Sequence, residues 1–404
     1  MTAQGGNSRG ALAGLRVVDL SRVLAGPLCT QMLADHGADV VKVEPPSGDE
    51  TRTLGPPFDD AGDAAYFSSI NRGKRSVALD LAQPAGRAVL ERLLAGADVL
   101  IENFLPGTMD RWGLGYDAVL APRHPRLIYC SITGFGADGP LGGLPGYDAV
   151  LQAVGGLMSV NGEPSSGPTR VGVPVVDHLT GYCALVGILL ALAERARSGR
   201  GQRIEATLFD TALSLLVPHA ANWLASGREP QLLGSAHPNI APYDKFEAGG
   251  GPIFLGILND KQFQRFCHAI ARPELATDAR FLNNAQRLQN REQLRAEIEP
   301  AMLAQPREQL CRELMRNGVP AGPVNTVSEA LEQPHAAHRA MRVGGADGYR
   351  GLGLTTRLGA TPGRAGIRPP RFSEHGRQVL REAGYSDAEI DALRDAGVLL
   401  EARR

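Results

Sequence analysis

An isolated carboxylate stands at the head of the most apolar stretch of the chain. Asp177 follows the apolar residues 171–176 and precedes an apolar run that reaches Leu192, after which the first cations are Arg195 and Arg197. The run predicts a buried helix, because cations favour the C-terminal end of a helix. Asp177 would then lie at or just before the start of this helix.

Two roles suit Asp177 on this evidence. Its carboxylate could accept hydrogen bonds from the first free backbone N–H groups of the helix, as an N-cap does. It could instead be a nucleophile, because a carboxylate whose water is replaced by a few fixed donors in a dry pocket becomes reactive. The two roles are compatible, so this stretch alone leaves both open.

The composition is that of a globular protein with about two domains. The chain has 404 residues, of which 43% are hydrophobic and 21% are charged, and its net charge is -1. Charges of like sign form no long run. The sequence therefore shows neither a nucleic-acid-binding surface nor a polybasic membrane patch.

The cysteines and histidines indicate neither disulfides nor a metal site. The five cysteines are widely scattered without a C-x-x-C pair, which suits thiols in a reducing compartment. The nine histidines lack the spacing of metal ligands. The N-terminus has no secretory signal, and the densest apolar run, at 182–193, is predicted to be too short to span a bilayer. We therefore expect a cytoplasmic protein without a bound metal.

Apolar strands alternate with helices through the first half of the chain. Short apolar runs bounded by turn residues predict the strands, and the segments between them have helical spacing. This alternation predicts an α/β fold with a doubly wound, mostly parallel sheet of the Rossmann-like type. The predicted strands are 15–20, 39–44, 76–79, 97–104, 126–132 and 202–209, and the predicted helices are 25–38, one after Pro84, one near 116–120, the run after Asp177 and one through Trp223.

A glycine-rich segment after one predicted strand matches a dinucleotide-binding pattern. Gly134-Phe-Gly136-Ala-Asp-Gly139 has the spacing G-x-G-x-x-G. In that fingerprint the third glycine opens a helix whose N-terminus holds the pyrophosphate. Here residues 140–146 are rich in glycine and proline and continue as a loop. We therefore expect a flexible loop that lines a cleft, not an NAD or FAD site.

A second, smaller α/β domain with long linkers is predicted in the second half of the chain. An extended segment at 234–243 precedes two strands around a turn at 249–251, and charged amphipathic helices continue to Gly318. The tail ends in two short helices that are expected to pack on the first domain. The predicted domains are 1–225 with 344–404, and 226–343, and residues 1–11 are predicted to be disordered because they are small and polar.

Short motifs are spread along nearly the whole chain, from Leu12 to the C-terminal helices. They are Leu20-Ser-Arg-Val-Leu-Ala-Gly-Pro27, Ala34-Asp-His-Gly-Ala-Asp-Val-Val-Lys-Val-Glu44, Gly48-Asp-Glu-Thr-Arg52, Asn71-Arg-Gly-Lys-Arg75, Glu102-Asn-Phe104 with Pro106-Gly107, and Pro145-Gly-Tyr-Asp148. In this order they resemble the family III CoA-transferases, whose members include formyl-CoA transferase and alpha-methylacyl-CoA racemase.

The resemblance implies a catalytic role for Asp177. This residue matches the family's nucleophile, an acidic residue before a long apolar helix, which attacks an acyl-CoA thioester and goes on to form a β-aspartyl-CoA thioester. Tyr147 and Asp148 match a tyrosine and an acid near the nucleophile, where the acid helps to position the reacting groups. The resemblance implies no cofactor beyond coenzyme A, which enters as part of the acyl-CoA substrate.

The resemblance also implies contacts with coenzyme A. Arg111 would bind a phosphate, a role that suits a guanidinium. In formyl-CoA transferase an arginine that stacks on the adenine follows the glutamate of the second strand, whereas Pro45 and Pro46 follow Glu44 here. Adenine binding must therefore differ locally. The matching CoA-contact positions are Val23, Leu24, Ala25, Leu79, Asn103, Phe104 and Arg111.

Position 147 favours CoA transfer over proton transfer. Racemases of the family carry a histidine there, whereas a neutral phenol, whose ordinary pKa is about 10, is a poor proton shuttle. Segments 237–243 and 318–325 look like those of members that use succinyl-CoA with short dicarboxylates. We therefore expect a CoA-transferase that acts on a short carboxylic or dicarboxylic acid. An acyl-CoA racemase or epimerase and a CoA-binding regulatory protein are the alternatives, and the resemblance implies a homodimer of interlinked chains.

Overall fold

The chain folds into two compact units. The computed structural model describes residues 10–345 and 347–401. The first unit consists of the chain up to Gly155, Gly172–Leu215 and the chain from Pro334, and the second consists of Gly156–Val171 and Leu216–Gln333.

These units differ from the predicted domains in three stretches. Residues 156–171 and 216–225 group with the second unit, and residues 334–343 group with the first. Segment 156–171 is tied to the second unit by a hydrogen bond of 3.0 Å from the N–H of Gly234 to the carbonyl of Gly162. Contacts between such distant residues leave no mark on local composition. Of the stretch predicted to be disordered, residues 1–9 lie outside the described residues.

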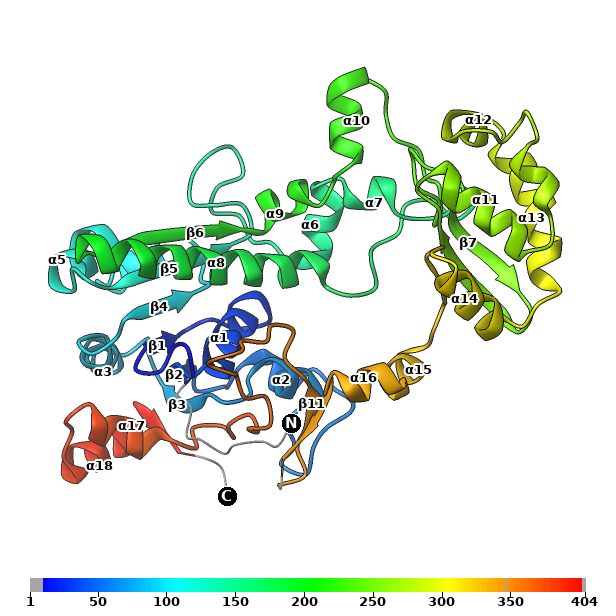
Figure 1. The fold of residues 1–404 in the computed structure, drawn as a ribbon. Coiled ribbons are helices and arrows are strands. Elements are labelled where there is room, and N and C mark those ends of the chain that lie inside the picture. The colour runs from blue at the N-terminus through cyan, green and yellow to red at the C-terminus, as the bar shows by residue number, and fades with distance from the viewer. Residues whose placement is uncertain (1–9, 346, 402–404) are drawn as a thin grey trace. The chain divides into compact units, whose positions relative to one another are not determined.

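A seven-stranded sheet forms the centre of the first unit (Figure 1). Its order is β12 (Leu399–Leu400), β3 (Arg75–Leu79), β2 (Asp39–Glu44), β1 (Arg16–Asp19), β4 (Val99–Glu102), β5 (Ile128–Thr133) and β6 (Arg203–Thr207). Neighbouring strands are parallel, except that β12 is antiparallel to β3. This order confirms the predicted doubly wound, mostly parallel sheet. Strand β12 was not predicted, because two residues are too few to show a pattern.

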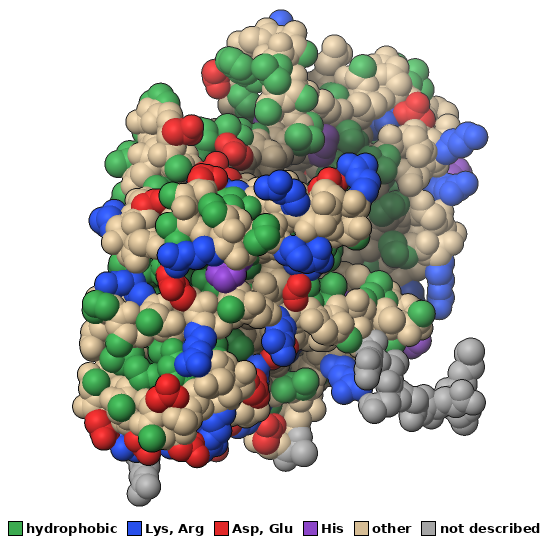
Figure 2. Space-filling model, turned by 90° about the vertical axis from the view of Figure 1, so that its left-hand side faces the viewer, with side chains coloured by type: hydrophobic (Ala, Val, Ile, Leu, Met, Phe, Trp, Pro, Cys, Tyr) green, Lys and Arg blue, Asp and Glu red, His purple; other side chains and the backbone are tan. Residues whose placement is uncertain are grey.

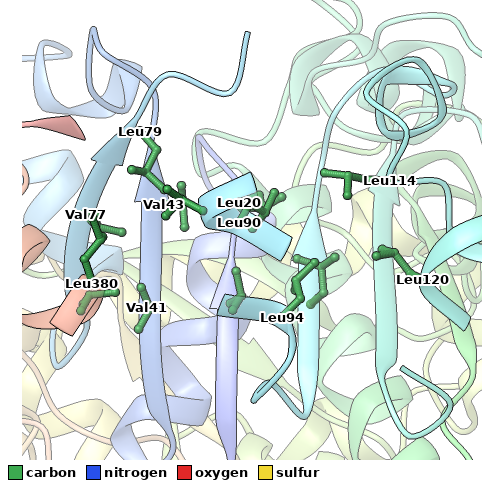
Figure 3. Close-up of a cluster of buried hydrophobic side chains, with 14 of the residues drawn as sticks. Leu20, Val41, Val43, Val77, Leu79, Leu90, Leu94, Leu114, Leu120 and Leu380 are labelled. Carbon is green, nitrogen blue, oxygen red and sulfur yellow. The ribbon is translucent and has the colours of Figure 1, made fainter. Parts of the chain in front are cut away.

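One hydrophobic core cluster of the first unit lies on one face of this sheet. Side chains alternate between the faces of a strand, so every second residue of β2 and β3 points to this face. Helices α3 (Pro84–Leu94) and α17 (Gly376–Glu382) cover it, and Figure 3 shows their Leu90 and Leu380 against the strand side chains. The C-terminal helices thus pack on the first unit, as predicted.

Helices α1 (Ala25–Asp35) and α8 (Val175–Ser198) cover the opposite face, where α8 lies along β5 and β6 (Figure 1). Helix α8 has 24 residues and ends at Ser198, because the next residue, Gly199, has a φ of 75° that is incompatible with the helix. It extends well beyond the apolar run at 182–193, and by length and composition it is sufficient to cross a membrane. The prediction that the apolar segment is too short was therefore wrong. In this structure one side of α8 packs against α1 and the sheet, and 39% of its apolar window is buried.

Buried polar contacts fix the loop between β1 and α1. Lys42 donates a hydrogen bond of 2.8 Å to the carbonyl of Ser21. Lys74 Nζ lies 3.1 Å from Asp19 Oδ2 and donates to the carbonyl of Pro27 at 2.9 Å. Both lysines are buried, and a buried cation is stable only when it is paired. The loop is therefore held from beneath by two lysines of neighbouring strands and loops.

The second unit has its own small sheet and core. Strands β7 (Tyr243–Ala248) and β8 (Gly251–Gly256) form the predicted hairpin, and β9 (Ala321–Pro323) pairs antiparallel with β8. The core of this unit lies between the sheet and its helices. The helices of this unit are α7 (Leu157–Val160), α10 (His219–Ser226), α11 (Asp260–Ala269), η3 (Pro273–Ala276), α12 (Asn284–Gln289), α13 (Arg291–Leu303), α14 (Arg307–Arg316) and α15 (Val327–Glu332).

The first unit also contains several short elements. They are η1 (Glu50–Arg52), α2 (Ala65–Ile70), α4 (Thr108–Arg111), η2 (Tyr116–Leu120), α5 (Ala121–Arg123), α6 (Asp148–Val154), α9 (Leu208–Ser214), α16 (Pro334–His338), β10 (Arg342–Gly344), β11 (Arg350–Leu352) and α18 (Asp387–Asp395). The helix predicted to run through Trp223 is interrupted, because Pro218 lies between α9 and α10.

Charged side chains of both signs are interspersed on the face drawn in Figure 2. This distribution agrees with the net charge of -1. A surface of mixed charge exerts little long-range attraction on a polyanion such as nucleic acid.

Candidate functional site

A cavity of about 440 Å³ opens at the carboxyl ends of four neighbouring strands of the first unit. Segments that follow β1, β4, β5 and β6 form its walls and contribute Leu24, Asn103, Gly134 and Leu208. From β1 the chain adds β2 and β3 on one side and β4, β5 and β6 on the other, so the topological switch point of the sheet lies between β1 and β4. Ligands of parallel α/β sheets bind in the crevice at the carboxyl ends of the strands at such a switch point. Asp177 also lines this cavity. The cavity is therefore the candidate active site.

Asp177 is the third residue of α8 and does not cap the helix. The N-cap position is Pro174, which makes no side-chain capping hydrogen bond. The cap comes from another helix: Asp148 Oδ1 accepts hydrogen bonds from the backbone N–H groups of Val176 at 2.8 Å and Asp177 at 3.2 Å. The interpretation of Asp177 as an N-cap was therefore wrong. A residue 29 positions away has taken the free N–H groups that Asp177 was expected to satisfy.

Asp148 is itself held firmly in this capping position. It is the first residue of α6 and only 8% exposed. Its second carboxylate oxygen accepts a hydrogen bond of 2.7 Å from Gln152 Nε2, one turn further along α6. Gln152 is fully buried. Both oxygens of Asp148 are thus engaged, and its negative charge is fixed beside the start of α8.

The electrostatic environment of Asp177 disfavours its charge. The pKa of Asp177 is raised to about 7, mainly by burial and in addition by the neighbouring negative charge of Asp148. Within the described residues, no hydrogen-bond donor to the Asp177 carboxylate is found that would offset the cost. Asp177 therefore titrates close to neutral pH. Its ionised form is poorly solvated, which is the state expected of a carboxylate nucleophile.

The loop after β1 carries backbone strain next to the cavity. Val23 has a φ of 68°, in the left-handed region that a β-branched residue rarely adopts. Asn103 holds the preceding residue with two hydrogen bonds, because its Oδ1 accepts from the N–H of Arg22 at 2.9 Å and its Nδ2 donates to the carbonyl of Arg22 at 2.7 Å. These two bonds, together with the buried lysines beneath the loop, keep the strained turn in place.

A glycine allows α8 to approach this loop closely. A Cβ atom on Gly181 would lie 2.7 Å from the carbonyl oxygen of Ala25, a distance that no side chain tolerates. Gly181 lies one turn after Asp177 on α8. The close approach of the two helices therefore brings the start of α1 and the carboxylate of Asp177 to the same cavity.

Seven of the predicted site residues come together in the cavity wall, and three do not line it. Leu79 is fully buried in the core beside β12, Arg111 is exposed on α4 and donates a hydrogen bond of 2.8 Å to Thr108 Oγ1, and Asp148 lies behind the wall. The roles of Leu79 and Arg111 in CoA binding stay predictions. The lining residues are Val23, Leu24, Ala25, Asn103, Phe104, Tyr147 and Asp177.

The sequence-based interpretation missed three polar residues near Asp177. Arg22 and Glu50 line the cavity; both lie inside quoted motifs, but nothing in the motifs singled them out. Burial raises the pKa of Tyr66 to about 12, and the charges of Asp177 and Asp148 add to this shift. The phenol of Tyr66 therefore lies in the field of both carboxylates. The short helix α2 that carries it was not predicted.

The glycine-rich segment after β5 is a loop, as predicted. Residues 134–147 contain no helix, and α6 begins only at Asp148. Gly134, Leu144 and Gly146 contribute to the cavity wall. In the part of the chain that the structure describes, no three His, Cys, Asp or Glu residues are grouped to hold a metal ion.

Comparisons with known proteins agree on one family. The profile of CoA-transferase family III matches residues 12–376. A succinate–glutarate CoA-transferase from Agrobacterium fabrum is 42% identical over 386 residues, which cover 93% of this chain and 96% of the relative. A succinyl-CoA:mesaconate CoA-transferase from Haloarcula marismortui is 40% identical over 389 residues, 93% of this chain and 97% of the relative. The crystal structure of a CAIB/BAIF family protein from Brucella suis has a TM-score of 0.84 and 44% identity, covering 93% of this chain and 100% of its own.

Replacing Asp177 by Asn is expected to stabilise the protein at alkaline pH. The pKa of Asp177 is about 7 in the folded chain against an ordinary value of 3.8. Between these values the folded chain holds a proton that the unfolded chain has lost, so stability falls as pH rises through this window and stays reduced above it. We expect Asp177→Asn to raise the free energy of unfolding at pH 8 by a few kcal/mol, roughly.

The measurement is urea unfolding of both proteins at pH 5 and pH 8. The gain should be smaller at pH 5, where the wild-type carboxyl is mostly protonated in the folded chain. Asp210→Asn is the matched control, because Asp210 is also the third residue of its helix but is exposed. An equal gain at both pH values would contradict the raised pKa of Asp177.

Proposed function

The chain belongs to CoA-transferase family III, and we propose that it transfers coenzyme A from succinyl-CoA to a short dicarboxylic acid with Asp177 as the nucleophile. The observation that carries this proposal is the Asp177 carboxylate, buried in the first turn of α8 and lining the cavity without a hydrogen-bond donor of its own among the described residues. The names of the two relatives, which join succinyl or succinate with a second diacid, support the substrate class.

The reaction proceeds through two covalent states of Asp177. Its carboxylate attacks the thioester carbonyl of succinyl-CoA, the C–S bond breaks, and a mixed anhydride and free CoA thiolate result. The thiolate then attacks the aspartyl carbonyl of the anhydride, which releases succinate and leaves an aspartyl-CoA thioester. The incoming acid repeats these steps in reverse order, and the product leaves as its CoA thioester. The carboxylate is regenerated, so the cycle balances without any cofactor beyond coenzyme A.

The surroundings of Asp177 serve this cycle. Asp148 fixes the first turn of α8 through two backbone N–H groups and so sets the position of the nucleophile. The apolar residues of the wall, such as Leu24 and Leu208, limit the access of water, which would hydrolyse the anhydride. Tyr147 is 67% exposed at the cavity. Of the described residues that line the cavity, none is a histidine, and the tyrosine at position 147 is the residue on which the preference for CoA transfer over racemisation rests.

The loops after β1 and β4 are proposed to bind coenzyme A. Val23, Leu24 and Ala25 from the first loop and Asn103 and Phe104 from the second line the cavity together. Their backbone is fixed before any ligand arrives, which lowers the entropic cost of binding. The five cysteines are free thiols, which supports our proposal of a reducing, cytoplasmic setting.

We also propose that the protein is a homodimer of interlinked chains. Helix α8 leaves Val186, Leu189 and Leu190 exposed by 53%, 42% and 65%. Their spacing of three and four residues places them on one side of the helix. Such an apolar stripe favours contact with another protein surface, and the proposed occupant is the second copy of the chain.

Asp177→Asn is expected to abolish CoA transfer and the covalent intermediate. The amide is not a nucleophile of comparable strength, so turnover should fall by at least ~10³-fold. Incubating the wild-type enzyme with succinyl-CoA and then hydroxylamine should place a hydroxamate on the peptide that contains Asp177, as read by mass spectrometry. Asp210→Asn should remain active and be labelled like the wild type. A labelled Asp177→Asn protein would refute the assigned nucleophile.

Asp148→Asn is expected to shift the pH dependence of turnover to lower pH. The neighbouring negative charge helps to raise the pKa of Asp177 to about 7, and the amide oxygen of the variant would still accept hydrogen bonds from the helix N–H groups. The acidic limb of kcat/KM, which follows ionisation of Asp177, should move down by about one pH unit. An unchanged or raised limb would show that the Asp148 charge does not act on the nucleophile.

Sedimentation across a dilution series is expected to show a dimer that does not dissociate while folded. Interlinked chains can separate only after unfolding. The double variant with Val186→Glu and Leu190→Glu should lose the dimer or fail to assemble, because two charges would be buried in the apolar contact. Leu258→Glu, a change at a position that is 57% exposed on the second unit, should remain dimeric. A folded wild-type monomer would refute the proposal.

A further inference from the structure

One cation shares the cavity with the nucleophile. Among the residues that line it in the described chain, Arg22 is the single lysine, arginine or histidine. We infer that Arg22 binds the carboxylate of the diacid that does not react, and so selects dicarboxylates over monocarboxylates. This inference rests on the proposed function and adds the residue that recognises the substrate class.

The hydrogen bonding of Arg22 leaves room for a ligand. Its Nη1 lies 2.9 Å from Glu50 Oε1, and this is the ion pair that engages the guanidinium. Its Nε is buried and has no hydrogen-bond partner in the described structure. A buried donor without a partner is costly. Among the described residues Arg22 Nη2 has no ion pair or hydrogen bond either, so this end of the guanidinium can donate to a ligand oxygen.

The pair with Glu50 is exchangeable. The side chain of Glu50 is 51% exposed and that of Arg22 is 35% exposed. Ion pairs with this much exposure contribute little to stability, so a substrate carboxylate can replace or join Glu50. The pair also keeps the guanidinium in one place while the cavity is empty.

The position of Arg22 is fixed through its backbone. Asn103 binds both the N–H and the carbonyl of Arg22, at 2.9 Å and 2.7 Å. The guanidinium lies 5.9 Å from the centre of the Phe104 ring, which restricts it further. A fixed, planar guanidinium matches a carboxylate with two parallel hydrogen bonds. The fixed backbone and the neighbouring Phe104 ring thus limit where the guanidinium of Arg22 can lie.

The location of Arg22 favours a carboxylate over a phosphate of coenzyme A. The reacting carbonyl must lie at Asp177, and Arg22 is in the wall of the same cavity. The pantetheine arm separates the phosphates of coenzyme A from the thioester, whereas the second carboxylate of a short diacid lies a few bonds from the reacting carbon. Because the cavity serves both half-reactions, Arg22 would hold the distal carboxylate of succinyl and of the incoming acid in turn.

The test is a competition between glutarate and its half-amide, glutaramate. The two acids have the same length and shape, but the half-amide lacks the second charge. Both are offered together with succinyl-CoA, and the two acyl-CoA products are measured by mass. Their ratio at equal acid concentrations gives the ratio of the two kcat/KM values. This ratio does not depend on the fraction of folded enzyme, so a partly unfolded variant remains informative.

Arg22→Gln is expected to lower the preference for glutarate by ~10²-fold, the loss typical when one partner of a close charge pair is removed. Arg22→Lys should give an intermediate ratio, because it keeps the charge but not the two parallel hydrogen bonds. Glu50→Gln should not lower the ratio, since it removes a competitor for the guanidinium. Arg123→Gln is the matched control: Arg123 forms a similar exposed ion pair of 2.8 Å with Glu91 outside the cavity, and its ratio should equal that of the wild type.

Three outcomes would overturn the inference. An unchanged ratio in Arg22→Gln, with the wild-type enzyme active, would refute the role of Arg22 and leave the proposed function intact. An equal loss for both acids, with a raised KM for succinyl-CoA that disappears for its 3′-dephospho form, would assign Arg22 to a phosphate of coenzyme A. A wild-type enzyme that transfers CoA to neither acid would refute the proposed function and this inference with it.

Discussion

The site depends on the burial of one carboxylate beside another. Asp148 takes the free N–H groups at the start of α8, so these groups cannot stabilise the charge of Asp177. Burial and the Asp148 charge together raise the pKa of Asp177 to about 7. In its ionised form a carboxylate that is poorly solvated is a far better nucleophile than one in water. This arrangement lowers the free energy of unfolding, because the rest of the protein must hold the two carboxylates close together.

The fold meets this requirement by placing the cavity at the carboxyl-terminal edge of its central sheet. The carboxyl ends of parallel strands supply the loops, and the reversal of strand order between β1 and β4 leaves space between them. Asn103 and the buried lysines hold the strained turn at Val23. Gly181 allows α8 to approach α1 closely. Asp177, from the middle of the chain, therefore lies beside the loop after β1, near the N-terminus of the chain.

Recognition and reaction use different walls of this cavity. Asp177, on α8, performs the covalent step, whereas Arg22, on the loop after β1, is suited to hold a charge at a distance from it. This division explains how one site can serve two half-reactions with similar acids. The nucleophile treats every acyl group alike, and the choice between acids depends on what the remote end can contact.

The sequence by itself determined the order of strands and helices and the isolation of Asp177. Short apolar runs and the spacing between them are local properties, so the parallel sheet could be predicted from them. The resemblance of the motifs to a known family implied the positions 23–25, 103 and 104, which line the cavity. The tertiary structure alone decided that Asp148 caps α8, that Arg22 shares the cavity with Asp177, and that Leu79 lies in the core. These relations join residues that are distant along the chain, such as 148 and 177 or 22 and 103. A local pattern contains no information about such contacts, because they arise only when strands and helices pack.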